Sequence, residues 1–202
     1  MSPTLPSYLF ASRPLWAAIF WGSFVAFNFV GWWAHARERS RAKGESRDRG
    51  SYRTLMMASM LGFVGIFAAP AFFPQIGIPL PGETVFAGGA VILWAGILLY
   101  VWSVRTLGEF FRTQVQLLEG QKLVTKGPYR ILRHPAYLGG ILIFTGLGAM
   151  TGNAVSTMLA PVVVGLGYAF RIHVEEIALR ERFGAAFDEH RKRTWAVIPL
   201  IW

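Results

Sequence analysis

Three stretches of the chain are apolar and free of charge over about 20 residues each. They are residues 15–34, 54–73 and 84–104. A membrane-spanning helix needs about 20 apolar residues, because each residue advances the helix by ~1.5 Å across ~30 Å of hydrocarbon. The pattern therefore predicts three transmembrane helices in the first half of the chain.

A fourth uncharged stretch, residues 137–170, is too long to be one helix across a bilayer. As a single straight helix it would be roughly 51 Å long. Its middle reads Thr151-Gly152-Asn153, a sequence typical of a turn. We therefore predict a hairpin of two shorter helices over residues 135–171, which brings the number of spans to about five.

The basic residues indicate the direction of the spans. The chain has 20 lysines and arginines against 11 acidic residues, which gives a net charge of +9. All but Arg13 lie in residues 37–53, 105–133 and 171–193. With five spans these segments share one side of the membrane, which the positive-inside rule identifies as the cytoplasm. The N-terminus is then outside and the C-terminus cytoplasmic, whereas a single helix at 137–170 would place the last basic segment outside.

Composition supports a membrane protein and narrows its chemistry. Hydrophobic residues make up 53% of the chain and charged residues 15%, against about 25% charge in soluble domains. Basic loops next to anionic lipid headgroups account for the net charge, so we expect membrane lipids and no nucleic acid as partners. The absence of cysteine excludes disulfides, thiolate metal sites and a cysteine nucleophile. The histidines lack metal-ligand spacing, and we expect no metal.

Outside the spans, the pattern predicts little regular structure. Residues 37–53 are rich in charge, and we expect a solvated basic connection there. Residues 122–125 are the one candidate for a strand. The predicted fold class is therefore all-α: a polytopic membrane protein of about five transmembrane helices with a C-terminal helical hairpin.

Polar chemistry first concentrates at Arg133-His134-Pro135, directly before the fourth span. Proline suits the first turn of a helix, because its φ angle is fixed and it has no N–H to satisfy. The free N–H groups of that turn, the helix dipole and the two basic side chains form a candidate anion site at the membrane edge. The alternative is a capped helix start whose basic residues bind lipid phosphate.

A second polar cluster, Arg171, Glu175 and Glu176, lies at the end of the fifth span. Arg171 and Glu175 are four residues apart and share a helix face. Charge at this depth is costly and usually functional, so Glu175 is a candidate acceptor for hydroxyl or amine groups of a ligand. The alternative is an Arg171–Glu175 ion pair. The amphipathic segment that follows is expected to lie against the membrane interface.

Together these motifs resemble the isoprenylcysteine carboxyl methyltransferase family and the related integral-membrane phospholipid amine methyltransferases. The motifs are Leu123-Val124, Gly127-Pro128-Tyr129, Arg133-His134-Pro135-x-Tyr137-x-Gly139 and Arg171-x-x-x-Glu175-Glu176. The resemblance implies that S-adenosylmethionine binds at the cytoplasmic end of the last two helices. It divides the chain into a three-helix membrane region, residues 1–104, and a methyltransferase core, residues 105–202.

The resemblance also assigns site residues. The implied cofactor pocket comprises Gln121, Lys122, Leu123 and Val124 through their backbone, and Tyr129, His134, Pro135, Ala136, Tyr137 and Glu175. An upstream family glutamine maps onto Gln114 or Gln116. The family arginine that contacts the acceptor matches Arg171, so Arg171 and Glu175 are the candidate catalytic residues, with Arg171 also binding substrate.

The implied activity is S-adenosylmethionine-dependent methyl transfer to a lipophilic or lipidated acceptor, with a prenylcysteine-like carboxylate as the leading candidate. A carboxylate is ionised at pH 7 and needs no general base, whereas the amine of a phospholipid would need one. Two other classes remain open. Sterol reductases, which use a nicotinamide cofactor, share the Arg-His-Pro-x-Tyr-x-Gly element, and a non-catalytic membrane protein would leave the polar clusters unexplained.

Overall fold

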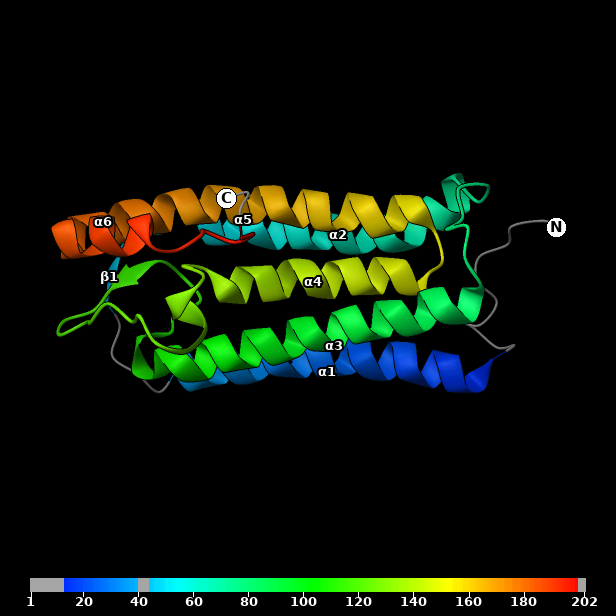
Figure 1. Cartoon of the computed structure of the whole chain (residues 1–202), viewed down its shortest axis with the longest axis horizontal. Helices are drawn as coiled ribbons and strands as arrows, with labels where there is room; N and C mark the ends of the chain where they lie inside the picture. Colours follow the sequence, from blue (N-terminus) through cyan, green and yellow to red (C-terminus); the bar gives the residue numbers. More distant parts are fainter. Residues whose placement is uncertain (1–12, 40–43, 200–202) are drawn as a thin grey trace.

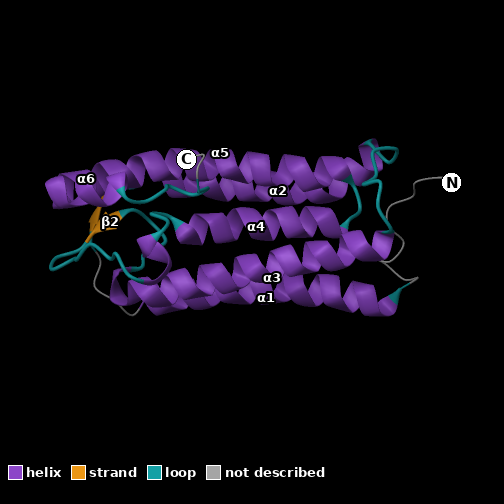
Figure 2. Ribbon diagram, viewed as in Figure 1, coloured by secondary structure: helices purple, strands orange, loops and turns teal. Residues whose placement is uncertain are grey.

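Five long helices run along a common axis and form an elongated bundle (Figure 1). The structure is a computed structural model that describes residues 13–39 and 44–199. The long helices are α1 (Pro14–Arg39), α2 (Ser51–Phe72), α3 (Gly82–Leu107), α4 (Pro135–Met150) and α5 (Ala154–Phe183). A short helix, α6 (Ala185–Lys192), and two 3-10 turns, η2 (Gly108–Phe110) and η3 (Gly127–Arg130), complete the helical structure of the described residues. Figure 2 shows how strongly helix predominates, and the all-α prediction is confirmed.

Helices α1, α2, α3 and α5 are long and apolar enough to cross a membrane. The predicted spans at 15–34, 54–73 and 84–104 coincide with the first three of these helices. Large apolar side chains on the helix surfaces are exposed rather than buried, among them Met60 and Leu166. Such a surface suits contact with lipid, and the protein is an integral membrane protein.

The uncharged stretch at 137–170 folds as the predicted hairpin. α4 is only 16 residues long and ends at Met150, and the chain then turns at Gly152 with a φ of 73°. Asn153 caps the next helix, because its side chain accepts a hydrogen bond from the backbone N–H of Ser156 at 3.1 Å. The Thr-Gly-Asn sequence therefore marks the turn for a physical reason: glycine adopts the left-handed conformation and asparagine supplies the cap.

Glycines bring α3 and α4 into close contact. A Cβ atom added at Gly96 would lie 2.7 Å from the carbonyl oxygen of Gly139, and one added at Gly146 would lie 2.5 Å from that of Gly89. Both distances are shorter than real Cβ contacts allow, so the two backbones approach closely only because these side chains are absent. This contact fixes α4, and with it the start of α4, against the bundle.

Two expectations about regular structure in the polar connections were wrong, although several described residues of 44–53 are exposed, as expected. Residues 122–125 form no strand; the two strands of the described chain are β1 (Glu45–Ser46) and β2 (Gln116–Leu117), which pair antiparallel. The connection at 37–53 is largely structured: α1 continues to Arg39, and β1 is held by a partner about 70 residues further along the chain. High charge in the local sequence concealed that pairing, while residues 40–43 of this connection lie outside the described part.

The bundle separates its connections into two ends. The long polar connections, α6 and the helix ends beside them gather at the left end of Figure 1 and together carry nearly all the basic residues, whereas the α2–α3 and α4–α5 connections lie at the right end and carry none. At the right end, Ile78 N–H donates to the carbonyl of Gly152 at 2.9 Å, and Asn153 Nδ2 donates to that of Phe73 at 2.8 Å. The functional candidates therefore all belong to the left end.

Candidate functional site

The start of α4 is fixed by the last described segment of the chain. The backbone N–H groups of Arg133 and His134 donate to the carbonyls of Trp195 and Ala196 at 2.8 and 2.9 Å, and Trp195 N–H donates to Ile131 at 3.0 Å. The side chain of Arg133 also donates to the carbonyl of Thr194. These bonds hold the backbone of His134, the residue that directly precedes Pro135 and α4.

The imidazole of His134 lies between two carboxylates of α5. Its Nδ1 is 3.5 Å from Glu175 Oε2, and its Nε2 is 3.3 Å from Glu176 Oε1. Burial alone would lower the pKa of His134, but its hydrogen bonds with Glu175 and Glu176 outweigh burial and raise that pKa above its ordinary value. The ring also stacks on Tyr137, with centroids 5.3 Å apart and planes at 1°. This arrangement favours a charged, rigidly held imidazolium.

The neighbouring Arg133 is paired as well. Its Nε donates to Glu176 Oε1 at 2.7 Å, and in the first turn of α4 the N–H groups of Tyr137 and Leu138 both bond to the carbonyl of His134. The basic groups expected to hold an anion at this helix start are therefore directed at carboxylates of the protein. The reason is the hairpin itself, because it places the start of α4 beside the end of the membrane-spanning part of α5.

Tyr137 joins the two candidate catalytic residues. Its hydroxyl donates to Glu175 Oε2 at 2.6 Å and accepts a hydrogen bond from Arg171 Nε at 2.8 Å. The alternative of a direct Arg171–Glu175 ion pair is thus replaced by a bridge through this hydroxyl. The spacing on the helix predicted the shared face of Arg171 and Glu175, but it could not predict that α4 inserts a tyrosine between them.

The remaining bonds of Arg171 go to segments that the sequence did not point to. Its Nη1 lies 3.2 Å from Asp48 Oδ1 and 3.3 Å from Ser51 Oγ, and its Nη2 donates to the carbonyl of Thr113 at 2.5 Å. With the bond to Tyr137, four of the five N–H groups of the guanidinium are used. Arg171 is only 3% exposed. No local motif could have revealed these partners, because Asp48 and Thr113 lie in polar connections far away in sequence.

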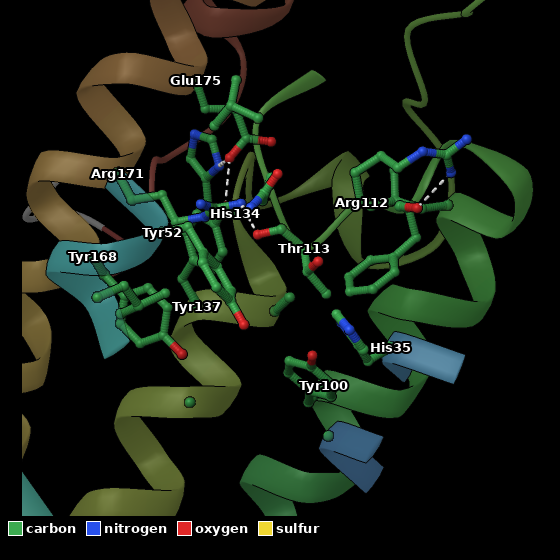
Figure 3. Close-up of a pocket in the computed structure, with 18 of the residues that line it drawn as sticks. His35, Tyr52, Tyr100, Arg112, Thr113, His134, Tyr137, Tyr168, Arg171 and Glu175 are labelled. Carbon is green, nitrogen blue, oxygen red and sulfur yellow. Dashed lines mark hydrogen bonds and ion pairs between the residues drawn. The ribbon is translucent and has the colours of Figure 1, made fainter. Parts of the chain in front are cut away.

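These groups border a cavity of about 740 Å³ (Figure 3). Arg171 and Tyr168 lie on one side of it, His35 and Arg112 on the other, with His134 between them. The predicted cofactor residues that line the cavity are Gln121, Lys122, Leu123, Val124, Tyr129, His134, Ala136, Tyr137 and Glu175. Pro135 is the exception, since it is fully buried in the helix start.

Both candidate glutamines line the cavity, but they differ in their contacts. Gln116 Oε1 accepts a hydrogen bond from the backbone N–H of Gly44 at 3.2 Å. Gln114 is exposed, and its side chain makes no hydrogen bond to any residue in the described ranges. Gln114 is therefore the glutamine with its amide available to a ligand.

The opposite part of the cavity is apolar and lies between α1 and α2. Its wall includes Phe24, Phe27 and Gly31 from α1 and Met56, Met60 and Phe63 from α2. One continuous space therefore connects the charged cluster at the start of α4 with a chamber inside the membrane-spanning part of the bundle. Sequence reasoning missed this contribution of the first two helices, because their residues carry no motif.

The fold and this site define an integral-membrane enzyme whose polar centre opens onto an apolar chamber, and comparison with known proteins agrees. A family model described as phospholipid methyltransferase matches residues 84–186. The chain is 32% identical over 152 residues to protein-S-isoprenylcysteine O-methyltransferase B of Arabidopsis thaliana, covering 74% of each chain. It therefore belongs to the isoprenylcysteine carboxyl methyltransferase and phospholipid methyltransferase family of integral-membrane methyltransferases, as the motifs predicted.

Two further comparisons show the breadth of that family. The chain is 39% identical over 100 residues to the cobalt-zinc-cadmium resistance protein CzcN of Cupriavidus metallidurans, covering 49% of this chain and 46% of the other. The solved structure of the eukaryotic intramembrane Ras methyltransferase ICMT superposes with a TM-score of 0.60 at 24% identity, covering 72% of this chain and 52% of that one. The chain thus spans between about half and three quarters of the length of these relatives.

Proposed function

We propose that the protein transfers a methyl group from S-adenosylmethionine to a lipophilic acceptor at the membrane surface. One observation carries this proposal: a single cavity joins the charged cluster at the start of α4 to an apolar chamber between α1 and α2. Its volume of about 740 Å³ lies within the range of small-molecule sites, roughly 300–1,000 Å³. A polar cofactor and an apolar acceptor can therefore meet in one space.

The residues at the polar end fit the cofactor. Both contacts of Glu175 within the described chain use Oε2, which leaves Oε1 for the ammonium group or the ribose hydroxyls of the ligand. The side chain of Glu175 is 30% exposed, and Tyr129, Ala136 and residues 121–124 line the same end of the cavity. S-adenosylmethionine supplies an electrophilic methyl group on a sulfonium, and these side chains would bind and orient it for in-line transfer.

The acceptor we propose is a prenylcysteine-like carboxylate. An apolar chamber suits an isoprenoid tail, and a carboxylate reaches the site already ionised. An amine would need a group to take its proton, but the nearby carboxylates Glu175 and Glu176 are already bound by His134 and Arg133, which weakens both as bases. Arg171 can offer its one remaining N–H to the acceptor as a charge-assisted hydrogen bond.

The two parts of the chain would then divide the work. Residues 105–202 hold the cofactor, as the proposed methyltransferase core, while α1 and α2 of the region 1–104 line the chamber for the acceptor. We also propose that the N-terminus is outside and that the site faces the cytoplasm. The support for this orientation is the positive-inside rule, because the basic connections gather at the end of the bundle that holds the site.

Calorimetry on the purified protein in detergent tests the cofactor. We expect binding of S-adenosylhomocysteine and no binding of NADPH. Glu175→Gln should weaken S-adenosylhomocysteine binding by roughly 10- to 100-fold, because a hydrogen bond to a charged group is lost. Glu83→Gln, at the opposite end of the bundle, is the matched control and should bind normally. Binding of NADPH alone would instead support the sterol-reductase alternative, and unchanged affinity in Glu175→Gln would place the cofactor elsewhere.

A further inference from the structure

A carboxylate in the α1–α2 connection lies at the centre of contacts among three parts of the bundle. Asp48 Oδ1 accepts hydrogen bonds from Ser51 Oγ at 2.9 Å and Val115 N–H at 3.2 Å, and lies 3.2 Å from Arg171 Nη1. Asp48 Oδ2 accepts the backbone N–H of Tyr52 at 3.0 Å. Asp48 therefore ties the start of α2, the segment before β2 and helix α5 to one another.

The surroundings of Asp48 hold it in place and keep it ionised. The neighbouring Arg47 N–H donates to the carbonyl of Val115 at 2.8 Å, in line with the β1–β2 pairing. Burial disfavours the charged form of Asp48, but the N–H groups of Tyr52 and Val115 outweigh burial and lower its pKa. The side chain is 13% exposed. The Asp48 carboxylate is therefore a fixed, charged group in a connection for which the sequence predicted only solvent exposure.

Asp48 does not itself border the cavity, whereas Arg171 does. Asp48 acts with Ser51 and Thr113 to prevent the guanidinium of Arg171 from turning, so that one of its N–H groups remains for a ligand. Arg171 is almost completely buried, and a buried guanidinium without a carboxylate partner is strongly unfavourable. Loss of the Asp48 charge would therefore allow Arg171 to move toward any other anion within its reach.

We propose that Asp48 is a positioning residue for methyl transfer, which acts by fixing the orientation in which Arg171 meets the acceptor. This inference rests on the proposed function. Asp48 precedes the segment matched by the family model, residues 84–186, so it would be a contribution of the α1–α2 connection to a charged cluster whose other members lie in the second half of the chain.

The variant Asp48→Asn tests the proposal, because asparagine keeps the size and one oxygen acceptor but removes the charge. We expect kcat with a prenylated cysteine to fall by about tenfold or more, while affinity for S-adenosylhomocysteine stays within about twofold. Glu45→Gln is the matched control, since Glu45 lies in the same connection with its side chain 67% exposed. Unchanged kcat in Asp48→Asn, or an equal loss in Glu45→Gln, would overturn the proposal.

A double-mutant cycle separates positioning from a merely structural role. If Asp48 acts through Arg171, adding Asp48→Asn to Arg171→Lys should lower kcat no further, so the two effects are not multiplicative. Multiplicative losses would contradict the proposal. Asp48→Glu serves as the rescue variant, and it also provides a test if the Asp48→Asn protein fails to fold. Because it restores the charge, its kcat should exceed that of Asp48→Asn and approach the wild-type value; a glutamate variant that folds but is inactive would overturn the proposal.

Hydrogen exchange tests the hydrogen bonds of Asp48 independently of the methyl-transfer activity. The amide of Val115 should exchange faster in Asp48→Asn than in the wild type or in Glu45→Gln, because its hydrogen bond to the carboxylate is weakened. Unchanged exchange would contradict the role of Asp48. A wild-type protein that fails to methylate the prenylated cysteine refutes the proposed acceptor instead, so the two failures are distinguishable.

Discussion

The charged side chains at the site form a series in which positive and negative groups alternate. Neighbours in the series are in direct contact or are joined by the Tyr137 hydroxyl. The series runs Asp48, Arg171, Glu175, His134, Glu176 and Arg133. Burying isolated charges beside a membrane is costly, but each of these groups has an opposite partner, which offsets much of the desolvation cost. The cluster can therefore remain ionised and rigid while it presents individual oxygen and N–H groups to ligands.

His134 should make the stability of the protein depend on pH. Its folded pKa is raised, so the stabilisation is complete below the unfolded pKa, about 6.5, and is lost as the pH rises through the folded pKa. We expect the thermal midpoint in detergent to fall as the pH rises above about 6.5. His134→Gln should flatten this part of the curve, whereas His173→Gln, at an exposed position of α5, should not. If the thermal midpoint of His134→Gln fell as steeply with pH as that of the wild type, the pH dependence could not be attributed to His134.

Sequence reasoning located five of the six charged residues of this cluster and missed Asp48. The motifs around His134 and Glu175 were sufficient, because the hairpin necessarily brings the start of one helix beside the end of the other. The way in which Arg171 is held was not predictable in the same way. Its partners Asp48 and Thr113 lie in connections whose polarity suggests only solvent exposure, and their contacts arise from the pairing of two strands of two residues each.

At the scale of elements, the hairpin was predictable and the position of α4 was not. Its apolar length and the turn sequence predict two helices, but they do not say which neighbour α4 packs against. That choice depends on glycines on both α3 and α4, whose missing side chains allow the two backbones to touch. A pairwise match of this kind becomes visible only when the helices are placed in space.

Gly146→Ala should therefore destabilise the bundle. The added Cβ atom would lie 2.5 Å from the carbonyl oxygen of Gly89, a backbone atom that moves only with its helix. We expect a loss of about 1–3 kcal/mol in unfolding free energy, measured by denaturation in detergent. Gly165→Ala, on α5 with open space around it, is the control and should be neutral or slightly stabilising. Equal stability of the two variants would show that the close contact is not needed.

At the scale of the whole molecule, the same bundle explains both the topology and the site. The connections at one end are short and carry no basic residues, while the connections, helix ends and α6 at the other end together carry almost all of them. Helix α4 is short, so its start lies deeper in the bundle than the ends of α3 and α5 at the left of Figure 1. An apolar acceptor in the bundle and a polar cofactor from the cytoplasm could meet there.

The proposed orientation has a direct test. Reporter fusions at residue 152 and at the C-terminus should report opposite sides of the membrane, with the C-terminus in the cytoplasm, because residue 152 precedes α5 in the sequence and the C-terminus follows it. A fusion in the basic α1–α2 connection should report the same side as the C-terminus. Reporters at residue 152 and at the C-terminus on one side would contradict the five-span arrangement.

The measurement that tests the central claim most directly is methyl transfer itself. The purified protein in liposomes is given S-adenosylmethionine labelled in its methyl group, with a prenylated cysteine that has a free carboxylate or with a phospholipid amine. We predict label in the prenylated cysteine as a methyl ester, released as methanol by base and greatly reduced in Arg171→Lys, because lysine cannot replace the planar guanidinium. Label found only in a base-stable N-methyl product would contradict the proposed acceptor, and the absence of transfer to either would contradict the proposed function.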